Sequence, residues 1–512
     1  MTDWTSGYVA DIGYTYGYYK ELNPIRGELA FLASGLAFPK ISSACELGFG
    51  QGISANIHAA GSVTDWYGTD FNPSQTAFAK ELAQTSGAKA HLYDDAFTEF
   101  VARTDLPEFD YIGLHGIWSW ISDENRESLV NFIKQKLKVG GVLYISYNTF
   151  PGWAAFAPIR KLMTEYSDVL AVQGQGTVHR VNEAVDFVDR LLATNPNYLK
   201  SNPVIAERVK NLKDQDRNYL AHEYFNRDWL PMHFADLVEK ISAAKVQYAC
   251  SAHYADHVDS INLTPDQQTF LSAIPDTVFR ENARDFMTNQ QFRRDYFVKG
   301  ARRLDPKSQA DRLRALRVIL VRDRSEITLK ANGSLGEAVM NEAIYVPILD
   351  VINDHRVHSF HQIELAIASH GIGFFQLVQA LMLLEATGCI SCAQDDALVQ
   401  KSKPQTDRLN SYFIKQAHVG SDFNYLASPV TGGGIAINRF SQLFLAGFQQ
   451  GKKTADELAL AVWAILVGQG QKIIKDGAIL EETDDNIAEI KRQAEAFLEK
   501  QVKIYKNLRI VV

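Results

Sequence analysis

Short apolar runs alternate with amphipathic stretches over residues 42–147 of the chain. The apolar runs have the length of buried strands, and the stretches between them fit helices with one apolar face. This alternation is typical of a parallel sheet whose strands are joined by helices. We predict strands at residues 43–47, 65–69, 90–93, 111–114 and 142–147, with helices at 53–60, 74–84 and 127–137.

The pattern changes after residue 152 and becomes sheet-like again further along the chain. Residues 157–217 are polar, compatible with helices and without strand-like runs, which predicts a helical insertion. A helix at 233–244 and strands at 245–252 and 292–299 then complete an open sheet of seven strands. The first domain is therefore expected to be discontinuous in sequence.

The second half of the chain is expected to be mainly helical. Residues 345–393 follow a helix, turn, helix, strand order, with the second helix at 374–384, and resemble a winged-helix module. That helix carries no basic residue for a DNA groove, so we expect it to pack against protein. The basic stretch 302–324 is expected to cover a domain junction with solvated charge, with a substrate-facing patch as the alternative. Further helices are predicted at 457–467 and 485–501.

The length of 512 residues exceeds what one hydrophobic core usually organises, so several domains are expected. The patterns above place an α/β domain at 1–150 and 216–300. A helical insertion at 151–215 lies between its two parts and is a candidate dimerisation segment. A middle domain at 301–400 and a C-terminal helical domain at 401–512 follow.

Charge and cysteine content narrow the class of protein. The net charge of −8 would repel a phosphate backbone, so nucleic acid is not the expected partner. Four cysteines do not make a disulfide framework in a chain of this length. The first seven residues lack an export signal, and no run of eighteen apolar residues predicts a membrane span. We expect a cytoplasmic protein without stable membrane insertion.

A glycine loop joins the first predicted strand to the helix that follows it. Residues 46–52 read Glu-Leu-Gly-Phe-Gly-Gln-Gly. Glycines let the backbone turn sharply off the strand and let a ligand approach closely. A dinucleotide site requires a third glycine where this chain has Ile53. The G-x-G-x-G spacing after an acidic residue is the pattern of S-adenosylmethionine sites, with Glu46 as the anionic partner of the ligand's amino-acid end, directly or through water.

Polar residues recur at the ends of the next strands. Asp70 follows Gly52 by eighteen residues and suits the two ribose hydroxyls as an acceptor. Asp95 suits the adenine amine, with Asp94 as the alternative, and Ala96 suits the adenine ring. Ligands of open α/β sheets bind at these strand ends, so the ordered series favours a cofactor site over a purely structural glycine turn. The predicted cofactor-binding residues are Glu46, Gly48, Phe49, Gly50, Gly52, Asp70, Phe71, Asp95, Ala96 and His115.

With the loop, Asp70 and the Leu-Lys-Val-Gly-Gly run at 137–141, residues 1–150 resemble the class I methyltransferase fold, a Rossmann-like domain. Other segments resemble bacterial methyltransferases that carry a "methyltransferase regulatory domain". These segments are 109–120, 144–153, 219–224 and 428–434.

Characterised relatives of that family include rickettsial protein-lysine methyltransferases that modify an outer-membrane protein and have dimerisation, middle and C-terminal segments. The resemblance implies S-adenosylmethionine as cofactor and lysine N-methylation as activity. The stretch 14–24 follows the family's aromatic, His-Pro-containing segment only loosely. If that segment closes over the substrate, the substrate specificity differs.

Methyl transfer from a sulfonium is an in-line displacement, so alignment, exclusion of water and a route for a proton matter more than a catalytic triad. The Asn/Asp-Pro-Pro-Tyr/Phe signature is absent after the fourth strand, which disfavours DNA base methylation. His115 is a candidate to orient substrate or take a proton, or simply lines the cofactor site. Trp118, Trp120 and Tyr147 either wall a channel for a cationic amine or sulfonium or belong to the core.

His222 and Glu223 either form a lid or belong to a capping network, and Tyr16 is a further candidate. The pair Cys389 and Cys392 has no second pair, so no metal site is predicted.

The leading hypothesis is a methyltransferase that acts on lysine in a protein, with a homodimer as a further expectation. One alternative is O- or N-methylation of a small molecule. A second alternative is a non-catalytic regulator that binds S-adenosylmethionine.

Overall fold

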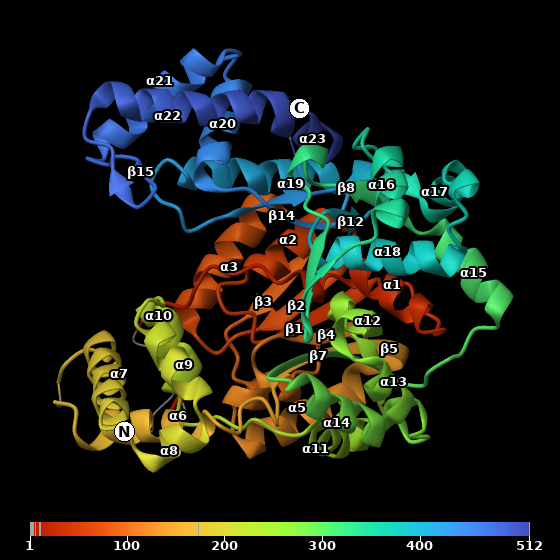
Figure 1. The fold of residues 1–512 in the computed structure, drawn as a ribbon, viewed down its shortest axis with the longest axis vertical. Coiled ribbons are helices and arrows are strands. Elements are labelled where there is room, and N and C mark those ends of the chain that lie inside the picture. The colour runs from red at the N-terminus through yellow and green to blue at the C-terminus, as the bar shows by residue number, and fades with distance from the viewer. Residues whose placement is uncertain (1–4, 6, 10–11, 173, 511–512) are drawn as a thin grey trace.

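The computed structural model describes residues 5, 7–9, 12–172 and 174–510; the expected lack of an export signal rests mainly on residues outside this range. A seven-stranded sheet of order β3-β2-β1-β4-β5-β7-β6 organises the first half of the chain (Figure 1). β7 is antiparallel to both of its neighbours, whereas β1 to β5 pair in parallel. The predicted α/β fold and its seven strands are confirmed. The strands are β1 (Ser43–Leu47), β2 (Asp65–Thr69), β3 (Ala90–Tyr93), β4 (Phe109–Leu114), β5 (Leu137–Asn148), β6 (Gln247–Ser251) and β7 (Phe292–Val298).

β5 begins at Leu137, where we predicted the end of a helix. Leu137 pairs with Phe109, and a register shift follows before Tyr111 pairs with Val142. The Lys138 ammonium lies 2.8 Å from a carboxylate oxygen of Asp110 on β4. These cross-strand contacts extend β5 through a Lys-Val-Gly-Gly stretch that has no strand pattern of its own.

Alternate strand residues face two different cores. On one face Tyr111, Tyr144 and Tyr296 pack with α1; on the other, Ile112 and Ile145 pack with α4, α5 and α11. Side-chain caps fix the starts of several helices. The Asn72 side chain accepts hydrogen bonds from two backbone N–H groups of α3, and the Ser122 side chain accepts one from α5. The helices of this domain are α1 (Pro24–Ala33), α2 (Ile53–Gly61), α3 (Pro73–Ser86), α4 (Phe97–Ala102), α5 (Asp123–Lys136), α11 (Phe234–Ile241) and α14 (Thr277–Thr288).

The insertion between β5 and β6 is helical, as predicted, in the part of it that the structure describes. Its helices share a small core that includes Trp153, Met163, Val185 and Leu220. They lie at the lower left of Figure 1, beside the carboxyl ends of the first strands. They are α6 (Ala157–Val169), α7 (Thr177–Ala193), α8 (Asn197–Ser201), α9 (Val204–Leu212) and α10 (Arg217–Tyr224).

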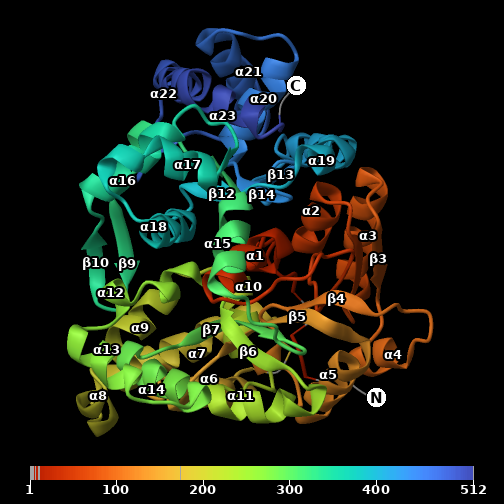
Figure 2. The same cartoon turned by 90° about the vertical axis from the view of Figure 1, so that its right-hand side faces the viewer.

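The middle region contains the predicted helix, turn, helix, strand order, and the strand joins a small antiparallel sheet of order β11-β8-β12. Its central strand β8 precedes the helices in the chain, so the winged-helix likeness stays a prediction. A hairpin of β9 and β10 extends from this region towards the first domain (Figure 2). The elements are α15 (Pro306–Ala315), β8 (Arg317–Leu320), β9 (Lys330–Gly333), β10 (Gly336–Val339), α16 (Glu342–Val351), β11 (His358–Ser359), α17 (Phe360–Ala366), α18 (Phe374–Ala386) and β12 (Ile390–Cys392).

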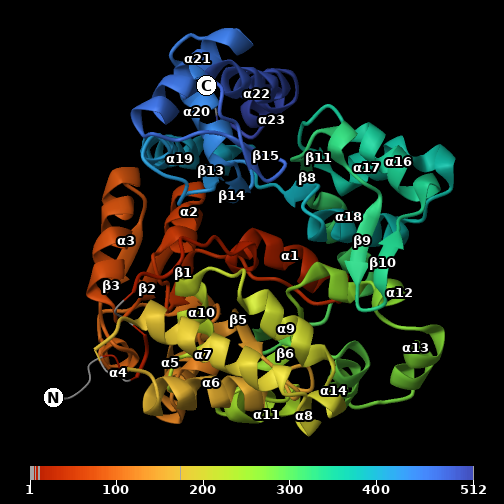
Figure 3. The ribbon, with the colours of Figure 1, turned by 60° about the vertical axis from the view of Figure 1, so that its left-hand side comes forward.

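The C-terminal region packs onto the first domain through α19, which lies across α2 and α3 (Figure 3). Ile57 and Leu82 of the first domain share a core with Leu409 and Phe413 of α19. None of the helices in the described ranges is long and apolar enough to cross a membrane. The elements are α19 (Asp396–Gln416), β13 (Tyr425–Ser428), β14 (Gly433–Ala436), α20 (Arg439–Gln449), α21 (Ala455–Gly468), α22 (Thr483–Ala496) and α23 (Val502–Asn507), with a short hairpin of β15 (Ile474–Lys475) and β16 (Ala478–Ile479).

Candidate active site

A pocket of about 350 Å³ lies at the carboxyl ends of β1, β2, β3 and β4. Nine of the ten predicted cofactor-binding residues line it: Glu46, Gly48, Phe49, Gly50, Asp70, Phe71, Asp95, Ala96 and His115. The tenth, Gly52, lies behind the loop, where a Cβ atom would come within 2.5 Å of Ala79 on α3. Gly52 is the N-cap residue of α2 and has a φ of +70°, a conformation that favours glycine, so it supports the shape of the loop without lining the pocket.

Two buried carboxylates define the floor of the pocket. Asp70 accepts a hydrogen bond from the Gly50 N–H at 2.8 Å on one oxygen and from the Asn72 N–H at 3.0 Å on the other. Burial raises the pKa of Asp70 to about 6, although these two bonds favour the ionised form. Each of its oxygens keeps a lone pair for a further donor. Asp70 therefore holds the glycine loop and can still accept two hydroxyl groups.

Glu46 is 3% exposed, and burial, together with the nearby Asp70 charge, raises its pKa to about 8. Its Oε2 atom has no hydrogen-bond partner among the residues that the structure describes. A buried acceptor without a partner costs free energy, about 1–3 kcal/mol. The geometry suits a ligand that brings a donor, such as an ammonium group, to this oxygen.

Asp95 and Ala96 stand at the end of β3 on the pocket wall. The Asp95 backbone oxygen accepts a hydrogen bond from the Thr69 hydroxyl, and one carboxylate oxygen lies 3.1 Å from the Arg103 guanidinium. Asp94 instead pairs with Lys80 at 3.6 Å and is outside the lining. Of the two aspartates, the structure brings Asp95 to the pocket.

His115 directly follows β4 and lies among three aromatic neighbours, Tyr19, Tyr144 and Phe292. Its Nδ1 atom lies 2.7 Å from the Tyr144 hydroxyl, and its ring stacks on Tyr19 with centroids 3.8 Å apart. Burial lowers the pKa of His115 to about 4. The imidazole is therefore neutral at physiological pH.

The structure places three of the predicted catalytic residues away from the pocket. Trp118 is fully buried and its indole N–H donates to the Met232 sulfur at 3.3 Å. Tyr147 donates to Asp295 at 2.8 Å, on the face of β5 opposite Tyr144, because residues three apart on a strand point to opposite sides. Tyr16 packs against Phe78 and Phe423. Of the three residues expected to wall a channel, Trp118 and Tyr147 belong to the core, whereas Trp120 lines the pocket.

Comparison with other proteins sets this geometry in a family. Residues 216–299 match the family described as predicted methyltransferase regulatory domain. The uncharacterized protein sll1526 of Synechocystis sp. is 39% identical over 499 residues, which are 96% of this chain and 97% of that protein. The chain belongs to the same protein family as sll1526, and its residues 216–299 carry the predicted methyltransferase regulatory domain.

The fold is that of a class I methyltransferase. A solved structure of PKMT2 from Rickettsia typhi in complex with AdoHcy aligns with 97% of this chain and 99% of its own, with a TM-score of 0.68 and 18% sequence identity. A second structure of PKMT2 from the same organism aligns with 95% of this chain with a TM-score of 0.67. At this identity the likeness concerns the fold.

A group of tyrosines forms one wall of the pocket, and Tyr14 lies against the glycine loop, where its backbone oxygen accepts a hydrogen bond from the Gln51 side chain at 3.3 Å. Tyr8, Tyr14 and Tyr19 line the pocket, and His222 of α10 packs behind Tyr8 and Tyr14 with ring centroids 5.5 and 5.0 Å away. His222 Nε2 lies 3.2 Å from the Ile12 backbone oxygen. His222, which is outside the lining, therefore helps to position the tyrosine wall formed by Tyr8, Tyr14 and Tyr19.

Glu223, next to His222 on α10, was predicted only as part of a lid or a capping network. Burial raises its pKa to about 7, and the Asn148 side chain and Arg208 oppose the rise. Its charge also contributes, after burial, to the raised pKa of Tyr8, Tyr14 and Tyr19. The Trp120 indole N–H donates to the Glu223 backbone oxygen at 3.2 Å, and Trp120 lines the pocket. A carboxylate with a pKa near 7 suits proton transfer at near-neutral pH, although Glu223 itself is outside the pocket lining.

Proposed function

We propose that this methyltransferase transfers a methyl group from S-adenosylmethionine to the side-chain amine of a lysine in a protein. The observation that carries the proposal is the pocket lined by Glu46, Asp70 and the three tyrosines Tyr8, Tyr14 and Tyr19, with Glu223 on α10 next to His222, which packs against Tyr8 and Tyr14. An amine acceptor needs a group that takes its proton, and a cationic ammonium is attracted by carboxylates and aromatic rings.

The pocket residues fit the proposed cofactor. Glu46 Oε2, buried and without a partner among the described residues, would accept from the amino group. Asp70 would accept the two ribose hydroxyls, and Asp95 with Ala96 would face the adenine. When bound, S-adenosylmethionine supplies an electrophilic methyl group on a positively charged sulfur.

The residues around the acceptor supply alignment and a proton route. Glu223 takes a proton from the lysine ammonium, because a neutral amine is the nucleophile and a pKa near 7 suits this transfer. The tyrosine wall excludes water and holds the amine in line. His115, neutral and held by Tyr144, positions Tyr19 in that wall.

Two further observations support a protein as substrate. The sequence resembles rickettsial protein-lysine methyltransferases, and the fold is shared with PKMT2. The net charge of −8 favours a basic target over nucleic acid.

The test is label transfer in a cell lysate with isotopically labelled S-adenosylmethionine and the purified full chain. We expect label on lysine side chains of protein, identified by mass spectrometry. The Asp70→Ala variant, which loses the ribose acceptor, serves as the matched control and should transfer none. Label that appears only in small molecules would contradict the proposed substrate class.

We place the protein in the cytoplasm and propose a homodimer through residues 151–215. The four free cysteines fit a reducing compartment. Val169, Leu170 and Val204 of the insertion are 75%, 63% and 70% exposed, and such apolar surface favours a partner.

A further inference from the structure

A second cavity, of about 890 Å³, lies at the β6 edge of the sheet, whereas the cofactor pocket lies at the carboxyl ends of β1 to β4. The edge strand β6, the neighbouring strand β7 and helix α14 form its walls, and residues Ser34 and Arg303 close its rim. Most of its lining falls within residues 216–299, the part that matches the regulatory-domain family. Its volume is within the range of small-molecule sites, about 300–1,000 Å³.

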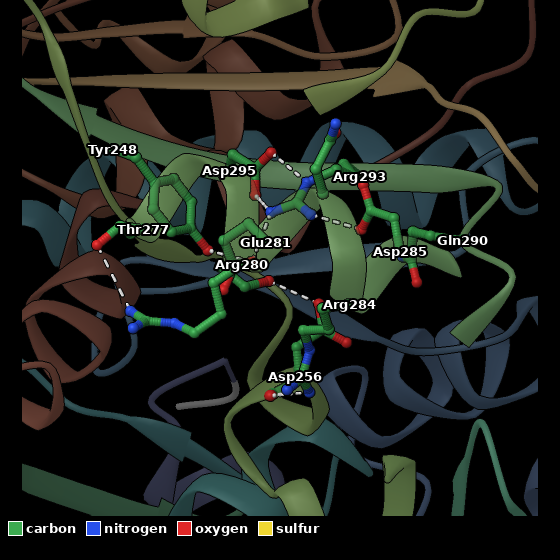
Figure 4. A network of polar contacts seen from close by, with 12 residues as sticks. Tyr248, Asp256, Thr277, Arg280, Glu281, Arg284, Asp285, Gln290, Arg293 and Asp295 are labelled. Atoms are coloured by element: carbon green, nitrogen blue, oxygen red, sulfur yellow. Dashed lines mark hydrogen bonds and ion pairs between the residues drawn. The ribbon is translucent and has the colours of Figure 1, made fainter. Parts of the chain in front are cut away.

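A buried ionic network forms the floor of this cavity (Figure 4). The Arg293 guanidinium binds Asp295 at 2.8 Å, Asp285 at 2.6 Å and Glu281 at 3.0 Å. The Tyr147 and Tyr248 hydroxyls complete the network. Arg293 is therefore fully engaged within the protein, and the network fixes α14 against β7.

The remaining charges around the cavity are predominantly positive. Outside the Arg293 network the lining contains four arginines and one aspartate, an excess of three positive charges; the network adds one arginine and three carboxylates, which leaves one net positive charge over the whole lining. The arginines are Arg280, Arg284, Arg294 and Arg303, and the aspartate is Asp256.

Two of these arginines are open to a ligand. The Arg280 guanidinium donates only to the Ile274 backbone oxygen and the Thr277 hydroxyl, at 3.2 and 3.5 Å, in the described part of the chain. Arg303 is exposed and forms no ion pair with a described residue. Arg284 already binds Asp259, and the Asp256 carboxylate accepts from Ser251. Guanidinium groups without carboxylate partners at a concave surface attract phosphate and carboxylate groups.

Arg294 connects this cavity to the active site. It lines the cavity, and its Nε lies 3.8 Å from a carboxylate oxygen of Glu21. The Arg294 guanidinium also lies over the Phe292 ring, 5.1 Å from its centroid, and Phe292 packs edge-on against His115 of the cofactor pocket with ring centroids 6.2 Å apart. Glu21 is buried, and its charge acts on His115. Burial is the main cause of the lowered pKa of His115; the Glu21 charge raises this pKa and the Arg294 charge lowers it. Tyr144 and Tyr19 are the other polar neighbours of His115.

We propose that the cavity between α14 and β6 binds a small organic polyanion, built of phosphate or carboxylate groups, through Arg280, Arg303 and Arg294, and that binding alters the active site through Glu21 and His115. The inference does not rest on the methyl acceptor. Arg280 and Arg303, the two guanidinium groups without carboxylate partners, offer two positive charges to one ligand, and the cavity has the volume of a small-molecule site.

Calorimetric titration of the full chain with pyrophosphate, and separately with citrate, tests the site. We expect saturable binding of at least one probe, and the stronger probe distinguishes a phosphate from a carboxylate source. The double variant Arg280→Gln/Arg303→Gln should bind at least about tenfold more weakly. Arg302→Gln, which removes the exposed neighbouring charge outside the lining, is the matched control and should bind like the wild type. Absence of saturable binding, or equal loss in the control, would overturn the site.

Nuclear magnetic resonance of His115 tests the coupling without any methyl transfer. An anion on Arg294 offsets a charge that holds the pKa of His115 down. We expect pyrophosphate or citrate to move the His115 titration to higher pH in the wild type but not in the double variant. An unchanged titration with the anion bound would overturn the coupling.

Discussion

At the scale of single residues, the pocket holds two buried carboxylates whose ionised forms are disfavoured by burial. Glu46 and Asp70 have pKa values raised to about 8 and about 6, and burial is the main cause for both. A cationic ligand group stabilises the ionised form of Glu46 and lowers its pKa. Protonation of Glu46 and binding of the cofactor are therefore linked.

We expect the affinity for S-adenosylmethionine to rise with pH until about pH 8. Below its pKa of about 8 Glu46 is protonated, so binding must displace a proton, and affinity falls by up to about tenfold per pH unit. Calorimetry at about pH 7 in buffers of different ionisation enthalpy measures the released proton. Glu46→Gln should bind more weakly at high pH and lose the pH dependence. A wild-type affinity that is flat between about pH 6 and pH 9 would contradict this role.

Glu223→Gln is expected to lower kcat by about 100-fold or more at neutral pH, because the amine loses its proton acceptor. In the wild type the rate should rise with pH and level off above about 7, where the Glu223 carboxylate becomes ionised. The measurement is a pH profile of kcat with a lysine-containing peptide substrate. Glu124→Gln, which changes an exposed carboxylate at the same pocket, is the matched control. Equal profiles for both variants would remove Glu223 from the proton route.

The site was predictable where it depends on local sequence. Glu46, Asp70 and Asp95 stand at successive strand ends, so the spacing of motifs is enough to place them. Tyr14 and His222 meet across about two hundred residues of chain, with ring centroids 5.0 Å apart, and no local pattern encodes that contact. Tyr147 was misplaced because a buried parallel strand has apolar residues on both faces, which hides the direction of each side chain.

At the scale of elements, the glycine-rich segment 431–434 lies against the end of α2. A Cβ atom on Gly61 would lie 2.8 Å from the Gly432 backbone, and the Gln394 side chain donates to the Gly61 oxygen at 2.7 Å. Gly432 has a φ of +61°. Two backbones approach closely here, which joins the C-terminal region to the cofactor-binding domain.

Gly61→Ala should destabilise the protein by about 1–3 kcal/mol, because the added methyl group meets backbone that has no rotamer to change. Thermal unfolding measures the change. Gly468→Ala is the matched control, since Gly468 also ends a helix and a Cβ there meets open space. It should leave the stability within about 0.5 kcal/mol of the wild type. A stable Gly61→Ala protein would show that the two backbones separate at little cost.

The periodicity of the sequence predicted the strands of the seven-stranded sheet but not those of the small sheets. β1, β2 and β3 have the predicted boundaries because each is a short buried run between turn signals. β8 gains its strand conformation from β11 and β12, which lie about 40 and 70 residues further along. Such pairing depends on tertiary contacts, so periodicity within β8 does not reveal it.

At the scale of the whole molecule, one buried ion pair ties the first domain to the middle region. Arg26 of α1 binds Glu385 of α18 through two hydrogen bonds of 2.8 Å, and both residues are at most 4% exposed. The Arg26 guanidinium also donates to the Ala252 backbone oxygen and lies over the Tyr254 ring. α1 is thereby held between the sheet and α18.

Arg26→Met should lower the free energy of unfolding by about 3–5 kcal/mol, because Glu385 is left as a buried charge without its main partner. The urea midpoint measures the loss, and Arg26→Met/Glu385→Leu should recover much of it. Lys20→Met is the control: Lys20 also faces Glu385, at 3.7 Å, but its side chain is 38% exposed. Its loss should cost less than about 1 kcal/mol. Equal effects of the two single variants would contradict the role of the buried pair.

The most direct measurement of the central claim is a crystal structure of the full chain with S-adenosylhomocysteine. The account predicts the ligand in the pocket of Glu46 and Asp70, with its amino group on Glu46, its ribose hydroxyls on Asp70 and its adenine beside Asp95. The homocysteine sulfur should face the tyrosine wall and Glu223. A pocket without this ligand at saturating concentration, or one that binds a nicotinamide dinucleotide instead, would contradict the account.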